Sequence, residues 1–138
     1  MAFISDQMCF ACGRDNPIGL KLSFRQEQDR YVTSFTADPQ FQGYHGIVHG
    51  GILATLLDEV MARYVWEKVG PSATAKLEVR YRRPAPTGEP LDVRGWITAE
   101  RQGGRIFETA ADIRAADGTV LAEATGLVMR VNLTGGTP

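Results

Sequence analysis

The sequence has almost no excess charge, no long apolar run and only two histidines. Its formal net charge of -1 does not favour binding to nucleic acid or to an anionic membrane, so neither is expected as a partner. The longest apolar run is interrupted by Asp58 and Glu59 and is far too short to span a bilayer. No serine stands in a context that, with these histidines, suggests a Ser-His-Asp triad.

Length and composition indicate a single globular domain. A chain of 138 residues with 43% hydrophobic and 22% charged residues is typical of one globular domain with a single core, covering residues 1–138. Residues 1–8 lack a basic segment, so no secretory signal is predicted and a cytoplasmic location is expected by default. Residues 1–18 are expected to form a leader loop and residues 133–138 a frayed tail.

One stretch, residues 45–62, predicts a long helix that begins at paired glycines. The helix is expected from Gly50 to Lys68, because Gly70 and Pro71 form a stop signal. At 100° per residue, one broad face is large and apolar and is expected to be buried: Leu53, Leu56, Leu57, Val60, Met61 and Tyr64. The other face carries small residues and one carboxylate: Gly51, Ala54, Thr55, Asp58 and Ala62. Asp58 therefore either points into a contact with a ligand or second chain, or is an ordinary solvated charge.

Alternating apolar and polar residues predict strands on both sides of this helix. They are expected at residues 20–25 and 30–36 before it, and at 73–83, 91–101, 105–116 and 119–132 after it. This order indicates an α+β fold with an antiparallel sheet wrapped around the helix. Such a fold leaves a sheet edge and the small-residue helix face uncovered, and pairing of two copies is the simplest way to cover both.

The two cysteines form a C-x-x-C pair at Cys9 and Cys12, and His45 and His49 add two further zinc-ligand types. Residues 13–44, with two predicted strands, separate the pairs, which is unlike a small zinc module. Nothing before Cys9 predicts the strand that a thioredoxin-type site requires. We therefore expect reduced thiols that pack the leader loop, and no metal site.

The pattern His-Gly-Gly, six further residues and then Asp58 resembles the helix motif of hotdog-fold acyl-CoA thioesterases, closest to the phenylacetyl-CoA thioesterase-like branch. Residues 9–22 are similar to a leader found in one subgroup of that superfamily. The resemblance covers roughly residues 9–132. It implies a hotdog fold with a five- to six-stranded sheet, an acyl-CoA substrate, and an active site at the interface of a homodimer or dimer of dimers. No cofactor is expected.

The resemblance also implies roles for individual residues. Gly50 supplies a backbone N–H that polarises the thioester carbonyl. Asp58 acts as general base for water or as nucleophile. His49 has a supporting role in positioning the loop or the thioester, or else only bonds nearby backbone. Gly51 and Thr55, on the small-residue helix face, are assigned to substrate binding.

Two positions depart from the pattern of related enzymes. An Asn often stands six residues before the motif histidine, where this chain has Gly43, so the neighbouring Gln42 is the candidate substrate contact. Some relatives place Ser before the proline that closes the third strand, where this chain has Arg83. Arg83 either meets a CoA phosphate or belongs, with Arg80 and Arg82, to a solvated strand face.

Three other functions remain open from the sequence. A hotdog protein can bind an acyl ligand without catalysis. A dehydratase or hydratase is disfavoured, because its Asp and His usually stand together on the loop whereas Asp58 lies within the helix. A zinc-binding interaction module is the least favoured. The acyl group is not specified by any residue pattern.

Overall fold

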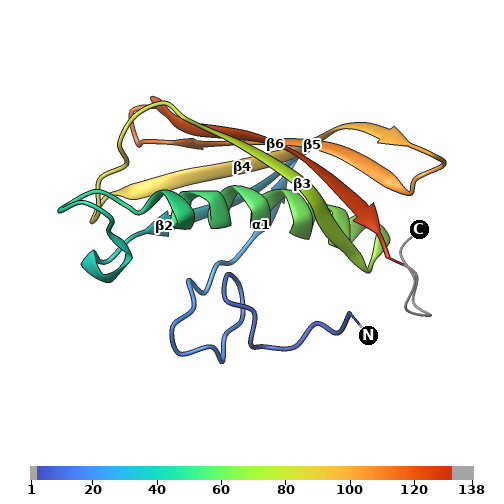
Figure 1. The fold of residues 1–138 in the computed structure, drawn as a ribbon, viewed down its shortest axis with the longest axis horizontal. Helices are drawn as coiled ribbons and strands as arrows, with labels where there is room; N and C mark the ends of the chain where they lie inside the picture. The colour runs from blue at the N-terminus through green and yellow to red at the C-terminus, as the bar shows by residue number, and fades with distance from the viewer. Residues whose placement is uncertain (1–2, 132–138) are drawn as a thin grey trace.

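The protein folds as one six-stranded antiparallel sheet and one long helix, as the computed structural model shows for residues 3–131 (Figure 1). The predicted frayed tail, residues 133–138, lies outside the described residues. The elements are β1 (Arg25–Glu27), β2 (Arg30–Thr36), a 3-10 turn (Pro39–Phe41), α1 (Gly50–Val69), β3 (Ser72–Tyr81), β4 (Pro90–Arg101), β5 (Ile106–Arg114) and β6 (Val120–Arg130).

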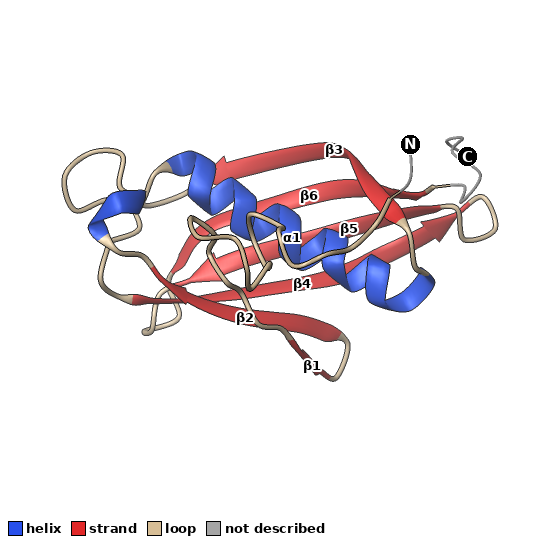
Figure 2. Cartoon of the chain, turned by 90° about the horizontal axis from the view of Figure 1, so that it is seen from below, coloured by secondary structure: helices blue, strands red, loops and turns tan. Residues whose placement is uncertain are grey.

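The strands lie in the order β1-β2-β4-β5-β6-β3, and every neighbouring pair is antiparallel. The helix α1 lies across one face of this sheet (Figure 2). This is the hotdog arrangement that the helix motif implied, and the predicted fold class is confirmed. Strands β1 and β3 form the two edges of the sheet, and β3 pairs only with β6 within residues 3–131.

The helix buries the face that its periodicity predicted. All six residues of the large apolar face are buried, and Val65 joins them. Gly70 ends the helix with a φ of 85°, a left-handed conformation that glycine adopts without cost, and its N–H donates to the Trp66 carbonyl at 2.8 Å. The sequence of α1, the long helix of residues 3–131, is not apolar enough to cross a membrane.

The predicted strand at residues 20–25 is wrong, since only Arg25 belongs to a strand, β1. Lys21 has a φ of 54°, which interrupts an extended run. Two backbone amides of this segment bond the leader: the Leu20 N–H donates to the Phe10 carbonyl at 2.9 Å, and the Leu22 N–H to that of Ala11 at 3.0 Å. Its contact with β2 is made by a side chain, since the Ser23 carbonyl accepts from the Thr33 hydroxyl at 2.6 Å. Leu20 and Leu22 are nevertheless buried, as their alternation with polar residues suggested.

The later strands agree with the predicted ranges to within two residues, but β3 contains an irregularity that the alternation did not reveal. Its register with β6 shifts between Thr74 and Lys76. The shift changes which side chains point toward the helix, because successive strand residues face opposite sides. As a result Thr74 reaches α1, and Leu77 and Val79, beyond the shift, also pack against the core.

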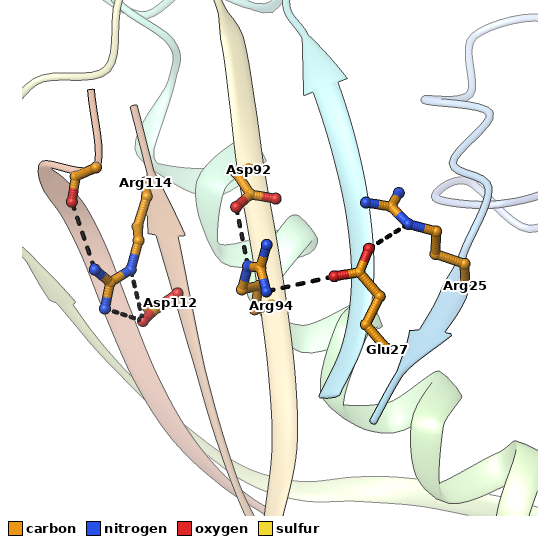
Figure 3. Close-up of polar contacts among 7 residues, drawn as sticks. Arg25, Glu27, Asp92, Arg94, Asp112 and Arg114 are labelled. Atoms are coloured by element: carbon orange, nitrogen blue, oxygen red, sulfur yellow. Dashed lines mark hydrogen bonds and ion pairs between the residues drawn. The ribbon is translucent and has the colours of Figure 1, made fainter. Parts of the chain in front are cut away.

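The sheet face opposite the helix carries arginine–carboxylate pairs, most of them between residues of one strand (Figure 3). Glu27 of β1 accepts from Arg25 and lies 3.6 Å from Arg94 of β4, which also bonds Asp92. On β5, Arg114 bonds Asp112 at 3.1 Å. The exposed pairs contribute little stability, whereas Asp112 is a buried carboxylate.

The leader loop passes beneath the helix, on the side away from the sheet (Figures 1 and 2). It is ordered by its own backbone hydrogen bonds, including Gly13 N–H to the Cys9 carbonyl and Asp15 N–H to the Gln7 carbonyl, both 2.8 Å. Ala11 is buried in the main core. The leader therefore covers one side of α1 and leaves another side, which includes Asp58, next to the β3 edge.

Candidate active site

The helix begins with a histidine cap that leaves one backbone amide available. His49 is the N-cap residue, and its Nδ1 accepts from the Gly51 N–H at 2.8 Å. The Ile52 and Leu53 amides bond the His49 carbonyl. Within residues 3–131 the Gly50 N–H has no hydrogen-bond partner. It lies at the positive end of the helix dipole, where an anion or a developing oxyanion is stabilised.

Replacing the cap should lower stability without changing the fold. A His49→Ala variant is expected to lose about 0.5–2 kcal/mol of unfolding free energy, because the Gly51 amide loses its acceptor. His49→Asn is the matched control, since asparagine is among the best N-cap residues. Urea denaturation of the three proteins measures the difference. Equal stability of His49→Ala and wild type would show that the cap contributes nothing.

A cavity of about 610 Å³ is lined by Gly50 and its neighbours at the start of α1. Its walls combine apolar side chains with Arg83 and with Tyr81, whose hydroxyl donates to the Gly50 carbonyl at 2.8 Å. Arg82 bonds Glu123, whereas Arg83 forms no salt bridge within the described part of the chain. The Arg83 guanidinium is therefore the available positive charge at this opening.

The other predicted binding residues line a separate, smaller cavity of about 390 Å³ on the far side of His49. Gln42, Gly51 and Thr55 all contribute to it. Their polar groups are partly engaged: Gln42 Oε1 accepts from the Gly46 N–H at 3.1 Å, and the Thr55 hydroxyl donates to the Gly51 carbonyl at 2.9 Å. Gly51 already gives its N–H to His49.

The position where related enzymes often carry Asn lies directly beside the cap. A Cβ at Gly43 would lie 3.5 Å from His49 Cδ2, which is an ordinary contact, so a side chain there would be held against the imidazole. Gln42 instead points its carbonyl oxygen into its own loop. The loop thus carries no side-chain carboxamide at position 43, where related enzymes often have Asn.

Asp58 lies apart from both cavities of its own chain. It stands eight residues after Gly50, which corresponds to about 12 Å along the helix axis. Its Oδ1 accepts from the Thr74 hydroxyl of β3 at 2.7 Å. One chain therefore does not bring Asp58 to a carbonyl that is held at its own Gly50.

A second polar cluster lies under the leader, where Cys9 and Cys12 meet Glu59 of α1. Burial, together with the negative charge of Asp58, raises the pKa of the Glu59 carboxyl. Burial and the neighbouring Glu59 raise the pKa of the Cys12 thiol to about 12. Neither His45 nor His49 joins this cluster within residues 3–131, so the zinc set of two cysteines and two histidines that the sequence left open is not formed.

Three of these contacts were not anticipated from the sequence. Glu59 was considered only as a charge that interrupts an apolar run. Thr74 reaches Asp58 only because β3 changes register beside it. Tyr81, which alternates in step with Leu77 and Val79, is 54% exposed and contacts the helix start.

Comparison with known proteins places these features in a family. The family model described as Thioesterase superfamily matches residues 45–122, which include the His49 cap, Gly50 and Asp58. The chain belongs to the thioesterase superfamily.

Relatives of this superfamily include acyl-coenzyme A thioesterase THEM4. The Bos taurus protein is 26% identical over 94% of this chain and 54% of its own length, and the Xenopus laevis protein is 30% identical over 78% of this chain and 48% of its own length. The chain thus spans about half the length of these curated relatives.

Solved structures of superfamily members show the same fold. A thioesterase superfamily protein superposes with a TM-score of 0.80 at 34% identity, over 88% of this chain and 62% of the other. The PaaI protein of the phenylacetic acid degradation operon of E. coli superposes with a TM-score of 0.71 at 18% identity, over 80% of this chain and 84% of its own. At that identity the second match supports the fold alone.

Proposed function

We propose that the protein is an acyl-CoA thioesterase that hydrolyses the thioester to a free acid and CoA. The observation that carries the proposal is the Gly50 N–H at the start of α1, which has no hydrogen-bond partner within residues 3–131 and belongs to a residue that lines a cavity of about 610 Å³. A thioester carbonyl oxygen bound there gains negative charge in the transition state, and the amide and the helix dipole stabilise it. The name of the THEM4 relatives agrees with this reaction.

The proposed active site needs two copies of the chain. Asp58 is about 12 Å along the helix from its own Gly50, so the Asp58 that acts on a bound thioester comes from a second subunit. The edge strand β3 and the helix face that carries Asp58 and the small residues Gly51 and Ala54 provide the surface on which the copies meet. A symmetric dimer then contains two equivalent sites.

In the proposed reaction, Asp58 takes a proton from water as the water oxygen attacks the thioester carbon, or the carboxylate attacks that carbon itself. With water as the nucleophile, the tetrahedral oxyanion rests on the Gly50 amide. Its collapse breaks the carbon–sulfur bond, and the proton held by Asp58 passes to the leaving thiolate.

The cavity walls suggest how the two ends of the substrate are held. Ile47, Val48 and Leu53 offer an apolar surface near the Gly50 amide, which suits the acyl group or the pantetheine arm. Arg83, exposed and without a salt bridge in residues 3–131, is suited to a phosphate of CoA. The smaller cavity lined by Gln42, Gly51 and Thr55 is proposed as a second contact surface for the same substrate.

Thiol release from a panel of aryl, short-, medium- and long-chain acyl-CoAs tests the proposed activity. Wild-type protein is expected to hydrolyse at least one class, and the preferred class identifies the acyl group. If the protein binds acyl-CoAs but releases no thiol from any of them, the proposal fails. A non-catalytic acyl-ligand-binding protein is then the better description.

Thr74 is proposed as a positioning residue for Asp58. A Thr74→Val variant, which keeps the shape but removes the hydroxyl, is expected to lower kcat by about tenfold, because misplacing a reacting group is costly. Thr74→Ser retains the donor and is expected to retain most of the activity. A change in KM without a change in kcat, or equal kcat in wild type, Thr74→Val and Thr74→Ser, would contradict the assignment.

A further inference from the structure

The cluster beneath the leader has the composition of a metal site. The Sγ atoms of Cys9 and Cys12 and a carboxylate oxygen of Glu59 lie within 4.8 Å of one another, and Cys9 Sγ is 3.9 Å from Glu59 Oε1. Tetrahedral zinc, with ligand bonds of about 2.0–2.3 Å, holds its ligand atoms about 3.3–3.8 Å apart. Shortening the separations between these atoms by at most about 1–1.5 Å therefore brings the three groups to metal-binding distances.

The turn that presents the two thiols is fixed by the backbone. The Cys12 N–H points at Cys9 Sγ at 3.4 Å, and the Gly13 N–H bonds the Cys9 carbonyl at 2.8 Å. A Cβ at Gly13 would lie only 2.4 Å from the Cys9 nitrogen, so the turn closes too tightly for any side chain at that position.

A cavity of about 240 Å³ adjoins the three groups and is bordered by Trp66 and Ser72. Ser72 is 8% exposed, and its hydroxyl is buried without a hydrogen-bond partner in the described part of the chain. Buried hydroxyls usually have a partner. A water molecule bound to a cation in this cavity would supply one, and it would also complete a four-coordinate site.

A divalent cation would offset most of the negative charge of the three ligand groups. Two thiolates and the Glu59 carboxylate together exceed the charge of one divalent cation by a single negative charge. Arg63, whose Nη1 lies 3.5 Å from Cys12 Sγ and whose Nε bonds Glu67 at 3.3 Å, places a positive charge beside the cluster from the next turn of α1.

We propose that Cys9, Cys12 and Glu59 bind one divalent cation of the zinc class, with a water held by Ser72 in the fourth position. Sulfur-rich mixed ligand sets of this kind favour zinc over magnesium or calcium. Because Cys9 and Cys12 belong to the leader and Glu59 belongs to α1, the ion fastens the leader to the helix. The proposal does not depend on the hydrolytic activity, since neither Gly50 nor Asp58 is a ligand.

The test is titration of the reduced protein, residues 1–138, freed of metal by a chelator, with Zn²⁺ in competition with a chromophoric chelator. Wild type is expected to bind one equivalent, and the bound ion should slow alkylation of both cysteines. With Co²⁺ as the probe, thiolate-to-metal absorption bands should appear.

Cys9→Ser and Cys12→Ser are each expected to weaken Zn²⁺ binding by about 100-fold or more, and Glu59→Gln by at least about tenfold. Glu78→Gln, on the outer side of β3, is the matched carboxylate control and should bind like wild type.

The alkylation measurement uses wild-type protein only, so it remains decisive if a cysteine variant does not fold. Unchanged alkylation rates at saturating Zn²⁺ would overturn the proposal. Undiminished binding by a Cys9→Ser, Cys12→Ser double variant would overturn it as well, because the ion would then lie elsewhere. Reduced wild type that binds no Zn²⁺ but forms a Cys9–Cys12 disulfide in air would identify a redox pair in place of a metal site.

Discussion

An Asp58→Asn variant is expected to hydrolyse acyl-CoA about 10²–10⁴-fold more slowly than wild type, with the loss in kcat. The carboxamide has the shape of the carboxylate, and its oxygen can still accept the Thr74 hydroxyl that bonds Oδ1. It is neither a useful base nor a nucleophile. The substitution therefore removes the proposed chemistry and leaves the packing between α1 and β3 in place.

Thiol release under single-turnover and steady-state conditions measures this loss, and thermal unfolding verifies that the variant is folded. Glu67→Gln is a suitable control, because Glu67 lies on the same helix and bonds Arg63 rather than β3. Substrate binding by Asp58→Asn should stay within a few-fold of wild type. Wild-type turnover by a folded Asp58→Asn protein would show that the carboxylate is not part of the reaction.

A Gly50→Pro variant is expected to lower kcat by about 10²–10³-fold, because it removes the backbone N–H that receives the oxyanion. Proline is well tolerated here for two reasons. Gly50 is the first residue of α1, where proline is favoured. His49, at φ −60° and ψ 137°, already has the extended conformation that a residue before proline prefers.

Gly50→Ala is the control that isolates the amide. Both substitutions add a Cβ, which would lie 3.4 Å from the Tyr81 ring, but only proline removes the N–H. Alanine is expected to retain activity within about tenfold of wild type, and kcat measured on the best acyl-CoA makes the comparison. Equal losses in the two variants would assign the effect to crowding at Tyr81 and would remove the oxyanion role from Gly50.

The same two variants together test whether each site is shared between subunits. Mixing Asp58→Asn with Gly50→Pro and allowing subunits to exchange should restore about a quarter of wild-type activity, since half of the dimers then contain one intact site. If both groups act within one chain, no mixed dimer contains an intact site and activity stays at the level of the single variants. Size-exclusion chromatography with light scattering verifies that the chains associate.

The periodic segments of the sequence specified most of the fold. The 3.6-residue spacing of Leu53, Leu57, Val60 and Tyr64 defined the buried helix face, and Gly70 marked its end. Period-two alternation located the strands after the helix, because each of them buries one face against α1. The same local patterns identified Gly50 as the helix start and Asp58 as an isolated carboxylate on a small-residue face.

Local sequence patterns did not predict the contacts between segments that are distant in the chain. Residues 20–24 alternate like a strand, yet their backbone bonds the leader, and only the three-dimensional path of the chain decides between these partners. The register shift in β3, which brings Thr74 to Asp58, likewise depends on pairing with β6. Cys9, Cys12 and Glu59 meet only because the leader folds beneath the helix.

The sequence by itself therefore determined the helix, the later strands and the amide at Gly50, since these follow from interactions between near neighbours. The tertiary structure alone decided which side chains surround Asp58 and Glu59, because long-range packing sets those contacts.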